Sequence, residues 1–195
     1  INRVFLRWLE NQSARPFFSF LNYIDAHDPY QTPPGFDRHF GVKPESDEDV
    51  ETLRTWHHRK RHDASAHQKD LVLDSYDDCL SVLDEHLGKL FDELERRGRL
   101  RDTLVVITSD HGEQFGEHGR YGHGNSLYRP EIHVPLVIFG TSGVPAGLRV
   151  SAPVSTRTIA ATVADHLEMA GASPFPGRSL TRFWNDRTTD LGADP

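Results

Sequence analysis

The longest periodic pattern in the chain repeats apolar residues at steps of three and four between residues 66 and 97. The residues in this pattern are Val72, Tyr76, Leu80, Leu83, Leu87, Leu90 and Leu94. Such spacing places them on one face of an α-helix, and Gly98 follows where a helix would end. The pattern therefore predicts a long amphipathic helix over 66–97.

Three shorter segments also carry helical signals. Residues 1–12 predict a helix that stops before Arg15-Pro16, because proline disfavours helix in the residue before it. A second helix is expected over 47–59 with Ser46 as its N-cap, and a third over 155–171, capped by Ser155 or Thr156 and ended by Gly171. The residues expected on the buried faces are Val4, Phe5, Trp8 and Leu9 in the first helix, and Val50, Leu53 and Trp56 or His57 in the second.

Three short, nearly continuous apolar runs are typical of strands covered on both faces. They are PFFSFLNYI (16–24), TLVVITS (103–109) and VPLVIFG (134–140), and VSAPVS (150–155) is a candidate for a short fourth strand. Apolar strands that alternate with helices favour an α/β fold with a mostly parallel sheet flanked by helices.

Two of these runs end in acidic and imidazole side chains, in YIDAHDPY and ITSDHGE. Ligand crevices in open α/β sheets lie outside the carboxyl ends of the strands. If the two strands are parallel neighbours, then Asp25, His27, Asp110 and His111 lie on one rim of the sheet. An adjacent carboxylate and imidazole supply two ligands to a divalent cation, so Asp110 and His111 are expected to form half of a metal site.

Each of these residues also has an ordinary structural interpretation. A histidine at a strand end is commonly a hydrogen-bonded structural group, Asp25 can cap a turn, and Asp-His-Gly makes ordinary turns. The glycine-rich loop with His118 and His123 could be solvated, and HHRKRHDASAH (57–67) mixes histidine with other charges, which favours an exposed segment over a metal cluster. The joint occurrence at two strand ends favours a functional site.

Composition narrows the classes of function. The length of 195 residues suits one domain, and the net charge of −7, with basic residues that mostly alternate with acids, argues against a nucleic-acid partner. No apolar run approaches the length of a membrane span, and the first residues lack a signal-peptide layout. The single cysteine, Cys79, is expected to be a core residue and leaves the redox compartment open. Because the chain begins without Met, we expect it to be a piece of a longer protein.

The motifs resemble the sulfatases of the alkaline phosphatase superfamily. The resemblance runs through PFFSFLNYIDAHDPYQTPP, the Tyr76 to Gly98 helix, TLVVITSDHGEQFGEHGRYGHGNSLYRPEIHVPLVIFG, VSTRTIAATVADHLEMAG and GRSL, in family order. Residues 38–70 and the tail are unmatched. The resemblance implies an alkaline phosphatase-like α/β/α sandwich, here as a partial domain, with 31–70 as a variable insert.

The resemblance also implies roles for four residues. Asp110 and His111 would hold the divalent metal opposite the nucleophile, Ca²⁺ in most sulfatases and Mn²⁺ or Zn²⁺ in relatives that act on phosphate or phosphonate esters. His27 would hydrogen-bond the sulfuryl oxygens and help protonate the leaving alcohol. His123 stands where many members carry a lysine, and unlike lysine it is cationic only near or below its pKa.

The family's nucleophile, a formylglycine made from Cys or Ser in a C/S-x-P-S-R-type motif, has no match here, since Cys79 is followed by Leu80 and Ser81 inside a predicted helix. We therefore interpret residues 1–195 as the C-terminal portion of one sulfatase catalytic domain, which we expect to be inactive by itself. The whole enzyme is expected to act on a small-molecule or saccharide sulfate ester. The alternatives are a phosphonate or phosphodiester hydrolase or phosphoglycerol-type transferase of the same superfamily, and a non-catalytic truncated domain. The sequence indicates neither a compartment nor an oligomeric state.

Overall fold

The computed structural model of the protein describes residues 1–12, 16–56, 63–169 and 174–185. It divides into two compact units, one made of residues 1–98 and 110–134 and the other of residues 99–109 and 135–195. The predicted exposed segment around His57, His58 and His62, and the predicted helix end at Gly171, lie outside the described residues.

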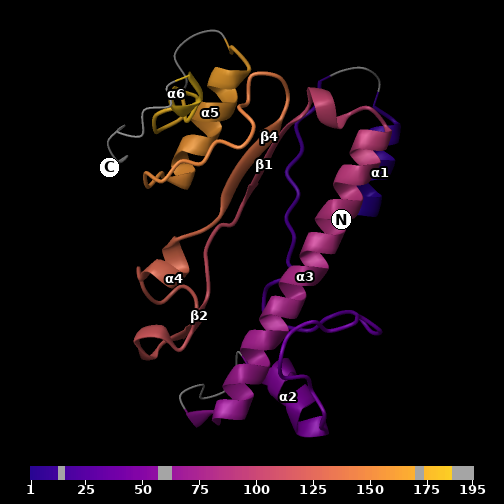
Figure 1. Ribbon diagram of the computed structural model, residues 1–195, viewed down its shortest axis with the longest axis vertical. Helices are drawn as coiled ribbons and strands as arrows, with labels where there is room; N and C mark the ends of the chain where they lie inside the picture. Colours follow the sequence, from indigo (N-terminus) through magenta and orange to yellow (C-terminus); the bar gives the residue numbers. More distant parts are fainter. Residues whose placement is uncertain (13–15, 57–62, 170–173, 186–195) are drawn as a thin grey trace. The chain divides into compact units, whose positions relative to one another are not determined.

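The long predicted helix is confirmed as α3, Ala66–Arg96, in the first unit (Figure 1). It begins with a capping box in which Ser65 and Gln68 satisfy each other's backbone N–H groups. It ends before Gly98, whose φ of +66° is readily reached only by glycine. Most of the predicted apolar face is at least half-buried, but Leu80 is 38% exposed.

The first predicted helix is α1, Asn2–Glu10, which lies beside the C-terminal half of α3 in Figure 1. Phe5 and Leu9 are buried as predicted, whereas Val4 is 71% exposed. Arg97 joins the two helices, because its guanidinium donates to the Leu6 carbonyl and to the Glu10 carboxylate.

The second predicted helix is α2, Asp47–Thr55, and it packs on the N-terminal end of α3 (Figure 1). Ser46 caps it as predicted, in a capping box with Asp49. Leu53 and Trp56 are each 2% exposed, but Val50, predicted on the same face, is exposed. The buried polar residues Asp49 and Thr52 occupy the face toward α3 instead, through hydrogen bonds to His67 and Gln68.

The prediction of a buried strand over 16–24 is wrong for this structure. The segment has no strand assignment, and its residues alternate between half-buried and exposed, with Phe18 and Phe20 each 81% exposed and Ile24 64% exposed. The period of two belongs to extended backbone that rests one face on the rest of its unit. Tyr23 holds it there, since the phenol donates to the Asn2 side chain at 2.5 Å.

The core of the first unit gathers residues from three segments that are distant in sequence. Its buried members are Tyr30, Leu53, Trp56, Leu71, Val72 and Cys79. Phe115 and Tyr121 pack against this cluster from the segment 110–134. The core therefore holds the loop after His27 against the glycine-rich segment.

The irregular segment before α2 is tied to α3 by buried carboxylates. Asp78 has a fully buried side chain that accepts from the backbone N–H of His39 at 2.8 Å and of Phe40 at 3.3 Å.

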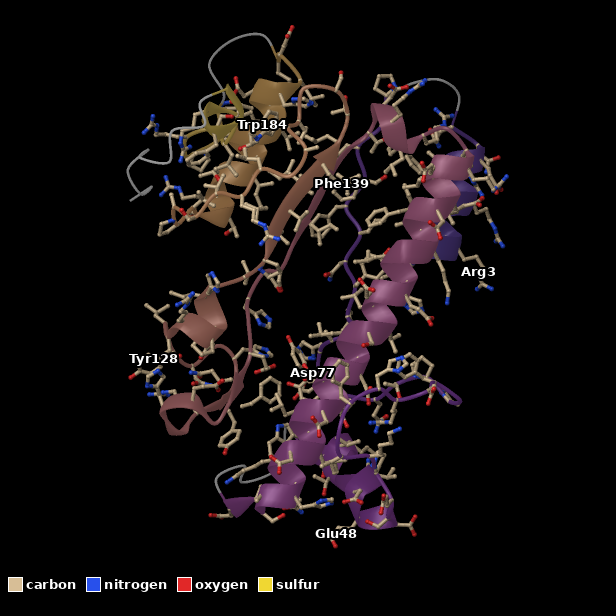
Figure 2. The ribbon with its side chains drawn as sticks, in the orientation of Figure 1. Arg3, Glu48, Asp77, Tyr128, Phe139 and Trp184 are labelled. Carbon is tan, nitrogen blue, oxygen red and sulfur yellow. The ribbon has the colours of Figure 1, made fainter. Side chains whose placement is uncertain are left out.

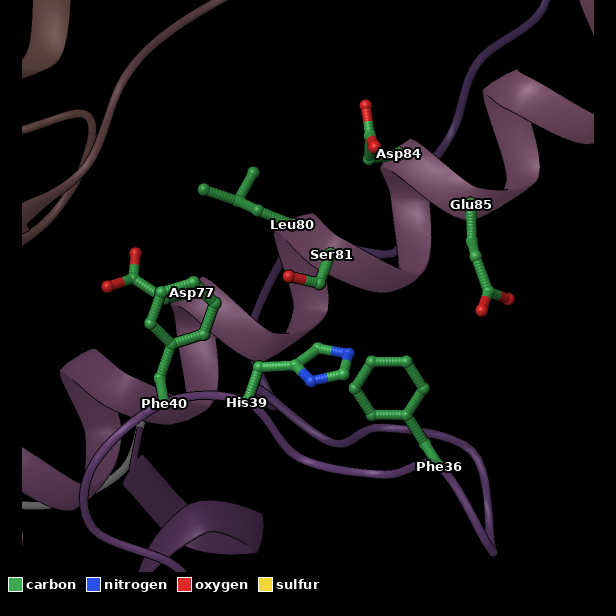
Figure 3. A pocket seen from close by; sticks show the side chains of 8 residues that line it. All are labelled: Phe36, His39, Phe40, Asp77, Leu80, Ser81, Asp84 and Glu85. Carbon is green, nitrogen blue, oxygen red and sulfur yellow. The ribbon is translucent and has the colours of Figure 1, made fainter.

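A hollow of about 620 Å³ lies between this loop and α3, and Figure 3 shows the rings of Phe36, His39 and Phe40 beside the helix. None of its lining residues is a predicted site residue.

The segment 110–134 folds into short elements that the sequence analysis did not predict. Gln114–Phe115 (β2) pairs antiparallel with Tyr121–Gly122 (β3), and the 3₁₀ turn Glu117–Gly119 joins them. Arg129–Ile132 (α4) follows, with Pro130 in its first turn.

The second unit contains the other two predicted strands, now β1, Leu104–Thr108, and β4, Leu136–Gly140. They run side by side but antiparallel, with Leu104 paired to Gly140 and Thr108 to Leu136 (Figure 1). The chain leaves β1 at the same end at which it enters β4, so this pair needs no crossover helix.

The other regular elements in the described part of the second unit are helices. Residues 150–155 form no strand, contrary to the prediction. Ser155 caps the 3₁₀ helix Thr156–Thr158, which continues into α5, Ile159–His166. The other two helical elements described in this unit are the 3₁₀ helix Leu100–Asp102, which precedes β1, and α6, Arg182–Asn185. Among the described residues no helix combines the length and apolarity needed to cross a membrane.

Candidate functional site

His27 lies in the turn that follows the extended segment 16–24. Its Nδ1 is 2.7 Å from the carbonyl oxygen of Asp28 and 3.1 Å from the Asp28 carboxylate. The side chain is 44% exposed, so the ring is anchored at one nitrogen while it remains open to solvent.

His123 follows β3 and stands between two glycines of positive φ, Gly122 at +82° and Gly124 at +76°. The loop after it is fixed by the buried Glu131, whose carboxylate accepts from the backbone N–H of Gly124 at 2.9 Å and from the Ser126 hydroxyl at 2.6 Å. These hydrogen bonds lower the pKa of Glu131, with the Ser126 hydroxyl as the main cause. The tight backbone path at His123 therefore rests on an ionised internal carboxylate.

Three of the predicted imidazoles meet within the first unit. The ring of His111 stacks on that of His123 with centroids 4.0 Å apart and an interplanar angle of 24°. The ring of His27 meets His123 edge-on, with centroids 5.2 Å apart and an angle of 70°. The structure thus joins the two motifs that the sequence analysis placed on one rim.

Asp110 lies beside this group. Its Oδ1 accepts from the backbone N–H of His111 at 3.0 Å and is 3.8 Å from the Nε2 atom of the same residue. Gly112 then turns the chain against α4, because its N–H donates to the Glu131 carbonyl at 2.6 Å. The Asp110 side chain is 88% exposed and that of His111 is 38% exposed.

Each of the three histidines is anchored through its own Nδ1 atom. The Nδ1 atoms of His27 and His111 lie 2.7 and 2.8 Å from the backbone carbonyls of Asp28 and Gly112, which can only accept, so each Nδ1 carries its proton. The Nδ1 of His123 lies 3.0 Å from a carboxylate oxygen of Glu113, which is also an acceptor when ionised. All three rings therefore direct Nε2 away from these anchors.

Glu113 is a site residue that the sequence analysis did not assign. Its Oε2 accepts from the Tyr30 hydroxyl at 2.9 Å as well as from His123, and its side chain is only 8% exposed. Tyr30 is 2% exposed and packs its ring against Tyr76 and Phe115. The tyrosine of HDPY and the glutamate of SDHGE, both visible in the sequence, are the two ends of this contact.

Two residues named with the candidate site lie elsewhere. Asp25, expected on the same rim, instead has its Oδ1 3.2 Å from Nδ1 of His86 on α3. The ring of His118 stacks at 3.9 Å on Tyr128, the residue that precedes α4 and is labelled in Figure 2.

The donor set fits half of a metal centre. Within the described part of the chain, no group of three or more His, Cys, Asp or Glu side chains could enclose an ion. The Asp110 and His111 pair offers one oxygen and one nitrogen, and the Nδ1–H bond of His111 to a carbonyl is the support that metal-binding imidazoles usually have. The pair is suited to supply two ligands to a site completed by further groups.

Cys79 is confirmed as a core residue. Its side chain is 1% exposed, and burial raises the pKa of the thiol to about 11. A buried thiol with that pKa is a poor nucleophile at neutral pH.

Sequence comparison relates the chain to known hydrolases. The family model described as Sulfatase matches residues 3–169. A sulfatase of Formosa agariphila is 30% identical over 115 residues, which are 57% of this chain and 22% of that protein. A choline-sulfatase of Rhizobium meliloti is 39% identical over 94 residues, 48% of this chain and 17% of that protein. The chain therefore spans about a fifth of the length of these relatives.

Structural comparison confirms the predicted α/β fold class as a partial domain. The chain superposes on a phosphonate monoester hydrolase from Silicibacter pomeroyi with a TM-score of 0.75 at 22% identity, and the match covers 97% of this chain and 42% of that one. At this identity the likeness establishes the alkaline phosphatase-like fold.

Proposed function

The chain belongs to the sulfatase family of the alkaline phosphatase superfamily, and we propose that it supplies the leaving-group side and half of the metal site of a sulfuric ester hydrolase. The substrate in this proposal is a small-molecule or saccharide sulfate ester. The observation that carries the proposal is the contact of three imidazoles, each anchored through Nδ1, beside the Asp110 carboxylate.

The chemistry of sulfuryl transfer matches this arrangement. Negative charge spreads over the equatorial oxygens in the transition state and develops on the leaving oxygen, so the site needs fixed positive groups and a proton donor. In this proposal His123 acts as the imidazolium and donates its Nε2–H to the sulfuryl oxygens. His27 donates the proton on its own Nε2 to the leaving alcohol while its Nδ1–H stays with the Asp28 carbonyl.

Asp110 and His111 would hold a divalent cation, Ca²⁺ for sulfate esters or Mn²⁺ or Zn²⁺ for phosphoryl chemistry. When bound, such an ion stabilises the charge on the non-bridging oxygens as a Lewis acid. The nucleophile, a formylglycine in this proposal, and the remaining ligands come from outside residues 1–195. The burial of Cys79 supports this assignment, since that thiol is not accessible to a substrate.

The proposal is tested by offering the intact protein an aryl sulfate and an aryl phosphate of the same phenol. We expect the higher kcat/KM on the sulfate. A higher kcat/KM on the phosphate, or on a matched phosphonate, would replace the sulfatase assignment with the phosphoryl alternative. No turnover of any of these esters would favour a non-catalytic domain.

The role of His27 is tested by its dependence on the leaving group. In His27→Asn, turnover of an alkyl sulfate should fall by roughly 10²- to 10⁴-fold, the usual contribution of a general acid. Turnover of a nitrophenyl sulfate should fall far less, because nitrophenolate leaves without protonation. His118→Asn is the matched control, since this imidazole lies in the same unit against Tyr128, and neither rate should change.

A further inference from the structure

Glu113 has no part in the chemistry proposed above, although it touches the site. It follows His111 and Gly112 at the start of the glycine-rich segment, and its side chain turns inward between Tyr30 and His123. Two donors, the Tyr30 hydroxyl at 2.9 Å and the His123 ring at 3.0 Å, share the single oxygen Oε2.

The second carboxylate oxygen of Glu113, Oε1, argues against a purely structural role for this residue. Oε1 is buried and has no hydrogen-bond partner among the described residues. The side chain is 8% exposed, and an ionised carboxylate is costly to bury with one oxygen unpaired. The negative charge of Glu113 reaches Tyr76, whose pKa is raised mainly by burial and further by Glu113.

Packing alone does not explain a carboxylate with an unpaired buried oxygen, and its contact with His123 indicates a role at the site. The contact between the Glu113 carboxylate and Nδ1 of His123 indicates what that role is. A strong acceptor on Nδ1 makes that nitrogen the protonated one, because the carboxylate cannot donate when ionised. Nε2 is then the ring nitrogen of His123 that Glu113 does not hold, in a ring that contacts those of His27 and His111.

We propose that Glu113 is a positioning residue that holds the His123 ring through its Nδ1–H and so leaves Nε2 as the ring nitrogen available to the substrate. The second half of this role rests on the proposed function. Tyr30 completes the arrangement from the HDPY loop, since its hydroxyl fixes the same Glu113 oxygen that His123 uses. The two motifs of the site are thus locked to one carboxylate.

The tautomer is tested by long-range ¹H–¹⁵N correlation of the imidazole rings in the ¹⁵N-labelled intact protein. The spectra are taken at about pH 8.5, above the ordinary imidazole pKa near 6.5. His123 is assigned by comparison with His123→Gln. We expect Nδ1 of His123 to carry the proton in the wild-type protein, and this form to be lost in Glu113→Ala.

Two variants separate positioning from general disturbance. Glu113→Gln keeps a carbonyl acceptor and should retain the Nδ1–H form. Glu117→Gln alters a carboxylate of the same loop that accepts from the Phe115 backbone, and it should also leave His123 unchanged. An Nε2–H ring in wild-type His123, or an Nδ1–H ring that persists in folded Glu113→Ala, would overturn the proposal.

A kinetic measurement connects the positioning to turnover. On an aryl sulfate, Glu113→Ala should lower kcat by roughly 10- to 100-fold, the usual loss when the partner of a site histidine is removed, and change KM less. Glu113→Gln should recover most of kcat. Absence of turnover in the wild type with the Nδ1–H form present would refute the sulfatase function and leave the tautomer assignment standing. Normal turnover in Glu113→Ala would refute the positioning role alone.

Discussion

Gly112 offers the sharpest test of how the segment with the proposed metal ligands Asp110 and His111 is held. Its backbone contacts the backbone of α4, where the Gly112 N–H donates to the Glu131 carbonyl at 2.6 Å. A Cβ at this position would overlap the carbonyl oxygen of Pro130 and would lie 3.1 Å from the Pro130 carbonyl carbon. Because the obstacle is backbone, no side-chain rotation can relieve it.

The expected effect of Gly112→Ala follows from two losses. The overlap forces the segment or α4 to move, and overpacking of this kind typically costs about 1 to 3 kcal/mol. The shift also weakens the hydrogen bond to Glu131, which contributes roughly 1 kcal/mol. We therefore expect the free energy of unfolding to fall by about 2 to 4 kcal/mol.

Gly88→Ala makes the same chemical change with the opposite expected sign. Gly88 lies inside α3, and an added Cβ there would have no heavy atom within 4 Å. Alanine in a helix interior is more favourable than glycine by roughly 0.5 to 1 kcal/mol, so this variant should be stabilised.

Both variants are measured by urea denaturation of the intact protein, with the free energy taken from the midpoint at unchanged slope. A titration with Ca²⁺ and Mn²⁺ follows, and weaker binding is expected in Gly112→Ala, since Asp110 and His111 precede the displaced residue. A Gly112→Ala protein as stable as the wild type, with unaltered metal binding, would refute the close backbone contact.

Three further predictions concern the first unit. Hydrogen bonds from the His67 ring, and then from Glu45 and Ser46, lower the pKa of Asp49 from 3.8 to about 2. Because the folded state binds this proton less tightly than the unfolded state, the stability that Asp49 adds is complete above about pH 4 and is lost as the pH falls toward about 2. The difference in urea midpoint between the wild type and Asp49→Asn should therefore shrink over that pH window. Asp78→Ala removes a fully buried carboxylate and the acceptor of the His39 and Phe40 backbone N–H groups, and it should lower the free energy of unfolding by about 2 to 4 kcal/mol in the same assay, whereas a change below about 0.5 would contradict the anchoring. The Cys79 thiol should resist a disulfide reagent at pH about 8 in the folded protein and react in urea, and fast labelling of the folded state would contradict its burial.

Local signals predicted the helices α1, α2, α3 and α5, though not the short α4 and α6, because the information for those four lies within the segments. The apolar repeat and Gly98 define α3, and Ser46 caps α2 through contacts three residues away. The strand prediction over 16–24 failed because pairing depends on neighbours that no local pattern encodes. Aromatic residues such as Phe18 and Phe20 favour extended backbone, and the segment is extended, but both rings are exposed.

Glu113 escaped prediction for a related reason. A glutamate after Asp-His-Gly carries no local sign of a buried partner, and its two partners are 83 and 10 residues away along the chain. The roles of His27, His123, Asp110 and His111 stay predictions, although three of these rings are now in contact.

The route by which these residues meet differs from the one the sequence suggested. The rim argument required the segments 16–24 and 103–109 to pair as parallel strands, and no strand forms over 16–24. His27 reaches His123 through aromatic packing instead, because the ring of the buried Tyr30 packs against Phe115 and its hydroxyl donates to Glu113 at the start of the glycine-rich segment. The shared site therefore depends on the core of the first unit, and a change that removes the Tyr30 ring should separate the imidazoles while a change in β1 should not.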